Sequence, residues 1–85
     1  MATMAEEFKE DFDNSVPGKQ WYALEEFKFF HGWQDKQEST SDYEEDEHSE
    51  KVRITFKDKS SVIVEYWQYV ENDAVLSAGN VVITK

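Results

Sequence analysis

Apolar residues near the N-terminus recur at every fourth position. Met4, Phe8 and Phe12 fall on one side of a helical repeat, and acidic residues fill most of the positions between them. Thr3 precedes this repeat and can cap a helix, while acids in the first turns suit the positive end of the helix dipole. The pattern predicts an acidic, amphipathic helix over residues 3–13.

The aromatic-rich segment 20–33 fits two different periods. Trp21, Leu24 and Phe27 form a helical stripe, whereas alternate positions from Trp21 to Trp33 are mostly apolar or aromatic, as in a strand. Aromatic side chains are enriched in strands because they pack well on a pleated surface. We therefore predict a strand over residues 20–33.

The following segment, residues 35–50, has no hydrophobic period. It consists largely of Ser, Thr, Gln, Asp and Glu, a composition that offers little apolar surface to bury. We predict a long, exposed acidic loop here.

The last third of the chain alternates between apolar and polar residues. Val52, Ile54 and Phe56 are separated by polar side chains, and residues 61–70 return as a second run of β-branched and aromatic residues. A short polar segment joins the two runs. The pattern predicts an antiparallel hairpin.

A further turn is predicted at Glu71-Asn72-Asp73, and Gly79 and Asn80 then lead into a closing strand over residues 81–84. Residues 51–85 then form a hairpin and a closing strand. The whole chain, residues 1–85, is predicted to be a single α+β domain. Its N-terminal helix packs on a small antiparallel sheet of three to five strands, with a long acidic loop.

Length and composition exclude several classes of protein. A chain of 85 residues has room for one small core, and the absence of cysteine excludes disulfides and thiolate nucleophiles. Apolar runs are far shorter than a membrane span needs, and the acidic N-terminus does not resemble an export signal. We expect a soluble, cytoplasmic protein without a membrane partner.

The formal net charge of −10 is concentrated in two segments. Residues 1–15 hold five acids against one lysine, and residues 35–50 hold eight acids against one lysine. Binding to nucleic acid or to an anionic membrane needs net positive charge, so direct binding of nucleic acid is not expected. A partner is expected to be basic.

No catalytic pattern is present. Neither a phosphate-binding glycine loop nor a nucleophile or zinc motif occurs, and His31 is expected to be a packing residue. Acidic and histidine side chains two apart suggest weak cation binding, but the spacing fails as a calcium loop: Asp42, Glu44, Asp46 and His48. We expect no enzyme activity, no cofactor and no metal site.

The aromatic residues allow two interpretations. Trp67, Tyr66 and Tyr69 could stack on single-stranded nucleic acid, but stacking platforms lie in basic grooves and this chain has few cations. A small domain needs large side chains to fill its core, so most rings are expected there, with one or two left as interface anchors.

The acidic segments resemble those of small inhibitors encoded by phages and mobile elements. The segments Ser41-Asp42-Tyr43-Glu44-Glu45-Asp46-Glu47 and Glu6-Glu7-Phe8-Lys9-Glu10-Asp11 carry this resemblance, together with small size and absence of cysteine. The class includes DNA mimics, anti-restriction proteins and anti-CRISPR proteins. The resemblance implies a non-enzymatic inhibitor that occupies the basic nucleic-acid-binding surface of a host enzyme, in the host cytoplasm. It also implies that an exposed edge strand allows a homodimer.

The residues expected to bind such a partner are carboxylates spaced about 5–7 Å apart on a helix or strand, a rhythm comparable to that of DNA phosphates. The predicted primary residues lie in the acidic loop, and the secondary residues lie on the helix: Asp42, Glu44, Glu45, Asp46 and Glu47, then Glu7, Glu10 and Asp11.

Two other functions fit the same sequence. Ser39 and Ser41 each precede an acid by three residues, as acidophilic kinases prefer, so the chain could be an adaptor with a phosphorylatable loop. It could also be a virion or scaffold component that assembles through its sheet.

Overall fold

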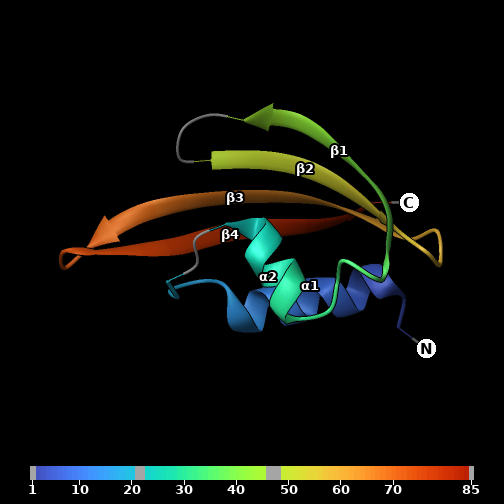
Figure 1. Ribbon diagram of the computed structural model, residues 1–85, viewed down its shortest axis with the longest axis horizontal. Helices are drawn as coiled ribbons and strands as arrows, with labels where there is room; N and C mark the ends of the chain where they lie inside the picture. Colours follow the sequence, from blue (N-terminus) through green and yellow to red (C-terminus); the bar gives the residue numbers. More distant parts are fainter. Residues whose placement is uncertain (1, 21–22, 46–48, 85) are drawn as a thin grey trace.

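The computed structural model describes residues 2–20, 23–45 and 49–84, and it shows two helices against a four-stranded antiparallel sheet (Figure 1). The strands follow one another in the order β1-β2-β3-β4. This is the predicted α+β arrangement, with the N-terminal helix on the sheet. In chain order the elements are α1 (Met4–Ser15), α2 (Leu24–Phe30), β1 (Gln37–Glu45), β2 (Ser49–Phe56), β3 (Ser61–Glu71) and β4 (Ala74–Thr84).

Helix α1 forms where the sequence predicts it and is fastened at its start. Thr3 is the N-cap of a complete capping box with Glu6. The turn between β2 and β3 supplies two further acceptors: Asp58 Oδ2 accepts the Met4 N–H at 2.8 Å, and Ser60 Oγ accepts the Ala5 N–H at 3.0 Å. The first backbone donors of the helix are therefore bonded to the sheet, which fixes how α1 lies on it.

The chain leaves α1 through a turn that protects the edge of the sheet. Lys19 donates its N–H to the Val16 carbonyl, which closes a turn at Pro17 and Gly18. Backbone hydrogen bonds of 2.8 Å then join this turn to Ser77 of β4, from the Gly18 N–H and to the Lys19 carbonyl. Because β4 is an edge strand, the turn covers part of an otherwise open row of backbone groups.

The predicted strand over residues 20–33 is wrong, because Leu24–Phe30 is helix α2. The helix buries Leu24 and Phe27 from the alternative helical stripe, and it ends in a Schellman motif. Trp33 donates its N–H to the Lys28 carbonyl, and Gly32, at φ +75°, donates to Phe29. Glycine adopts the left-handed conformation at little cost. Gly32 therefore ends the helix, and it is a helix-stop signal that lies within an aromatic-rich segment. Residues 21–22 lie outside the described part.

The predicted acidic loop over residues 35–50 is also wrong. Residues 37–45 form the edge strand β1, which pairs antiparallel with β2 and carries register shifts near Gln37 and Asp42. An edge strand obtains its hydrogen bonds from its neighbour's backbone, so a polar sequence does not prevent it from forming. Residues 46–48 lie outside the described part of the chain.

The predicted hairpin of β2 and β3 and the predicted turn at Asn72 and Asp73 are confirmed, whereas the closing strand is longer than predicted and includes Gly79 and Asn80. Both residues lie inside β4, which pairs with β3 along its whole length. The turn between β3 and β4 is at Asn72 and Asp73, whose φ angles of 50° and 64° fit a two-residue hairpin turn. The hairpin therefore extends as one long ribbon past the helices (Figure 1).

The core lies between the helices and one face of the sheet. Phe8 of α1 is its centre: its ring lies 5.7 Å from Phe27, 5.2 Å from Trp33 and 5.5 Å from Phe56. Most aromatic rings of the described residues are core residues, as predicted. More than the predicted one or two lie outside the core, since Phe29 and Phe30 are exposed and Trp67 and Tyr69 are only part-buried. Three strands of the sheet contribute the residues that face the helices: Val52, Ile54, Phe56, Val62, Val64, Tyr66 and Val81.

Candidate functional site

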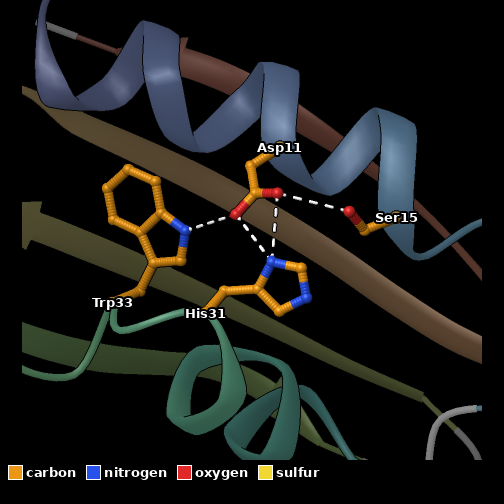
Figure 2. Close-up of polar contacts among 4 residues, drawn as sticks. All are labelled: Asp11, Ser15, His31 and Trp33. Atoms are coloured by element: carbon orange, nitrogen blue, oxygen red, sulfur yellow. Dashed lines mark hydrogen bonds and ion pairs between the residues drawn. The ribbon is translucent and has the colours of Figure 1, made fainter.

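A cluster of polar side chains joins α1 to the chain that follows α2 (Figure 2). Asp11 is at its centre, with one carboxylate oxygen accepting the Trp33 indole N–H at 2.7 Å. The other carboxylate oxygen accepts the Ser15 hydroxyl at 3.2 Å, and His31 Nδ1 lies 3.0 Å from Asp11 Oδ2.

This arrangement is suited to a structural role. In a nucleophilic triad, the serine bonds the imidazole and the carboxylate orients the imidazole from its other side. Here Ser15 donates to the Asp11 carboxylate, and the His31 ring lies 4.5 Å from the Phe27 ring. His31 is therefore a part-buried packing residue, as the sequence predicted, with its Nδ1 fixed by Asp11.

The predicted partner-binding residues on α1 divide into two groups. Glu7 and Glu10 are exposed, so their carboxylates are available to a partner. Asp11 is half-buried and bonded to Trp33, Ser15 and His31. Neutralising Asp11 would disturb the fold as well as the surface charge.

The predicted primary residues lie at one end of the first hairpin of the sheet. The register places Asp42 opposite Val52, Glu44 opposite Lys51 and Glu45 opposite Glu50. These positions belong to an edge strand, so their backbone is held by the ladder with β2. Asp46 and Glu47 lie outside the described residues.

The structure does not bring the two acidic segments together. Helix α1 packs on β3 and β4, whereas β1 lies at the other side of the sheet. Figure 1 shows β1 and α1 along opposite long edges of the molecule. The acids of α1 and those of β1 therefore form two surfaces, and one flat partner surface cannot contact both.

Two carboxylates at the N-terminus of α1 have lowered pKa values. The Met4 N–H, followed by the Ser60 hydroxyl, holds the pKa of Asp58 below its ordinary 3.8. The Thr3 backbone and side chain hold the pKa of Glu6 below its ordinary 4.5. In both cases hydrogen bonds favour the charged form. These acids are committed to capping the helix.

Lys28 is a cation buried in the helix layer. Its side chain is 1% exposed, and its Nζ lies 2.6 Å from Glu25 and 3.2 Å from the Gln37 amide oxygen. These contacts link α2 to the start of β1. Among the described residues, no three His, Asp or Glu side chains lie close enough together to hold a metal ion.

Sequence reasoning missed two features of the molecule. One is the anchoring role of Asp11, which follows Phe8 by three residues and so borders the apolar stripe of α1. The other is the set of apolar residues on the sheet face away from the helices. The register of β3 and β4 places these residues, among them Trp67 and Val82, on the face away from the helices. Alternation along these strands was visible in the sequence, but the side that the helices cover was not.

Comparison of the chain with protein-family models, with curated proteins and with solved structures found no match. No helix among the described residues is long and apolar enough to cross a membrane.

Proposed function

We propose that this protein is a non-enzymatic inhibitor that binds the basic nucleic-acid-binding surface of a host enzyme. The contact surface is the acidic end of the β1–β2 hairpin. Residues 42–50 contain six acids and no lysine or arginine: Asp42, Glu44, Glu45, Asp46, Glu47 and Glu50. This concentration of charge on an edge hairpin is the observation that carries the proposal.

The charge at this end of the hairpin opposes folding. Glu45 pairs with Glu50 across the ladder, and like charges directly opposite each other destabilise a sheet. The sequence places two further acids, Asp46 and Glu47, between these strands. A cationic groove would relieve this repulsion on binding, so the free energy lost in folding is recovered in the complex.

Strand spacing supports recognition by a surface that normally binds phosphates. Alternate positions along a strand repeat at about 6.6 Å, so the carboxylates of β1 can follow a row of cations. The exposed Glu7 and Glu10 form a second, separate acidic surface on α1. We assign them a secondary role in attracting the partner, because charges outside a contact mainly affect the rate of association. A target of this kind lies in the host cytoplasm.

The test compares three double variants that remove the same charge. Glu44→Gln/Glu45→Gln changes the proposed contact, Glu7→Gln/Glu10→Gln changes α1, and Glu71→Gln/Asp73→Asn changes the exposed end of the other hairpin. Each variant is titrated into a purified bacterial restriction endonuclease or CRISPR nuclease bound to fluorescent DNA. Displacement of the DNA is followed by anisotropy at several salt concentrations.

We expect the unmodified protein to displace DNA from at least one such enzyme, with weaker displacement at higher salt. The Glu44/Glu45 variant should weaken displacement by at least about tenfold, since each charged contact contributes on the order of 1 kcal/mol or more. The Glu7/Glu10 variant should lose less, and the Glu71/Asp73 variant should be unchanged. Equal losses in all three variants would show that only net charge matters, and would contradict the proposed contact.

A further inference from the structure

The helices cover only one face of the sheet, and we call the other side the outer face (Figure 1). Residues that pair across the ladder share a face, so the register identifies which side chains belong to the outer face. Trp67 pairs with Ala78, Tyr69 with Leu76, and Ile63 with Val82. The outer face therefore carries five large apolar or aromatic side chains on β3 and β4: Ile63, Trp67, Tyr69, Leu76 and Val82.

This composition differs from that of a sheet face exposed to water. An antiparallel sheet with one solvated face normally alternates between apolar residues inside and polar residues outside. Here Val82 is 56% exposed, although it lies beside Val81, which is 4% exposed on the covered face. The cross-strand row of Lys51, Glu65 and Asn80 divides the apolar residues into two groups, Ile63 with Val82 and Trp67 with Tyr69 and Leu76. Apolar residues gathered on an uncovered sheet face mark an interaction site.

The charge is balanced on the part of the outer face that β2, β3 and β4 form. On β2, β3 and β4 it holds two cations, Lys51 and Arg53, and two acids, Glu65 and Glu71. Lys51 Nζ lies 3.7 Å from Glu65 Oε1. Two copies of a chain with a net charge of −10 repel each other at the acidic surfaces of α1 and β1. At the outer face of these three strands they can meet without bringing an excess of acids together.

The area of the outer face suits an interface between two small domains. Strands β2, β3 and β4, spaced about 4.8 Å apart and up to 11 residues long at about 3.4 Å per residue, span on the order of 500 Å². Two such faces would together bury on the order of 1,000 Å², about the smallest area of a specific interface.

We propose that the outer face is the interface of a homodimer in which two sheets pack face to face. Sheets packed in this way align their strands within about 30° and interdigitate their side chains. Trp67 lies near the middle of the contact, with Val82 toward one end and Tyr69 toward the other. The edge strand β1 stays free, so the dimer presents two copies of the acidic hairpin.

Single-stranded nucleic acid is the competing occupant, because aromatic residues on an open sheet can stack on bases. Such platforms rely on a cationic groove. The three strands offer Lys51 and Arg53 only, and Lys51 is already next to Glu65. Charge therefore favours the second copy.

The test is sedimentation equilibrium of the full chain over a wide concentration range. Val82→Glu places a charge in the proposed contact, and Val70→Glu is the matched control. Val70 is 72% exposed on the same hairpin but has the opposite parity to Tyr69, so it lies outside the outer face. Tyr69→Lys provides a second interface variant of opposite charge. Circular dichroism and thermal unfolding establish that each variant is folded.

We expect the unmodified chain to be a dimer that persists at high salt, because burial of apolar surface is not screened. Val82→Glu and Tyr69→Lys should weaken dimerisation by at least about tenfold, and Val70→Glu should leave it within about twofold. A monomer at all concentrations, or equal weakening by Val70→Glu, would overturn the proposal.

A fluorescent oligothymidylate distinguishes the competing occupant. If it binds the unmodified chain, and Tyr69→Lys or Val82→Glu alters that binding, the outer face is a nucleic-acid site and the dimer is overturned. No binding is the result expected. Both outcomes are independent of the enzyme displacement assay, which depends on the acidic hairpin.

Discussion

The two faces of the sheet are built from similar side chains and differ in what covers them. On the covered face, Ile54, Val62 and Val64 are fully buried beneath α1 and α2. On the outer face, Val82 remains more than half exposed. β-Branched and aromatic residues supply both faces, so composition alone does not distinguish a core from an interaction surface. The difference is made by a helical layer that spans one side only.

The attachment of that layer explains why the covered face is a stable core. Helix α1 is bonded at its start to the turn between β2 and β3, and the chain beyond its end pairs with β4. Asp11 adds a bond to Trp33 in the middle. The helix is thus held at three points along its length. The outer face has no comparable layer among the described residues.

The largest effect on stability is expected at Gly79, where Phe12 of α1 packs against β4. A Cβ at Gly79 would lie 2.7 Å from Phe12 Cζ and against the carbonyl oxygen of Glu65. Gly79→Ala should therefore lower the free energy of unfolding by about 3 kcal/mol, near the upper end for overpacking. Alanine in an ordinary strand position would instead be favourable. Urea denaturation measures the difference, and a neutral or stabilising result would contradict the close packing of Phe12.

A smaller and more discriminating effect comes from two neighbouring valines of β4. Val81→Ala removes two buried methyl groups and should lower the free energy of unfolding by about 1.5 kcal/mol at any protein concentration. Val82→Ala should cost less than about 0.5 kcal/mol in dilute solution, as exposed sites do. If the outer face is an interface, the cost of Val82→Ala should increase with protein concentration. Equal costs for both valines in dilute solution would mean that something within the chain covers the outer face.

The smallest effect on stability depends on pH. It tests the hydrogen bonds that attach the start of α1 to the turn between β2 and β3. The folded-state pKa of Asp58 is depressed, so its contribution to stability is present above its unfolded value of 3.8 and is lost as pH falls through the folded pKa. Glu6 behaves in the same way below 4.5.

Asp58→Asn should therefore lower the melting temperature at neutral pH. On acidification, the melting temperature of this variant should fall less than that of the unmodified protein. The comparison is made by thermal unfolding at neutral pH and near pH 3. A variant that loses as much as the unmodified chain would show that Asp58 does not contribute to acid sensitivity.

Local signals in the sequence predicted α1 and the hairpin of β2 and β3. Both segments repeat with a clear period and end at recognisable caps or turns. The segment around Leu24 contained a helical stripe and Gly32 as a stop, but its aromatic content outweighed them in the prediction. The acidic segment 35–50 was assigned to a loop because it lacks apolar residues. Its strand depends on backbone hydrogen bonds to β2, which side-chain patterns do not reveal.

The candidate site was predicted in part. The sequence identified the acids of both segments. The structure places one set on α1, which packs on β3 and β4, and the other on β1 at the far side of the sheet. It also showed that Asp11 is occupied by Trp33, Ser15 and His31. Those contacts join residues up to 22 positions apart, so no local pattern could have shown them.

The sequence by itself determined the charge, the α+β class and the elements whose side chains repeat with one period, because these depend on neighbours along the chain. Tertiary structure alone decided which sheet face became the core, why a glycine lies within β4, and which acids remained free for a partner. These outcomes depend on contacts between distant segments. A strand presents two faces with the same regularity, and only the docking of the helices makes them different.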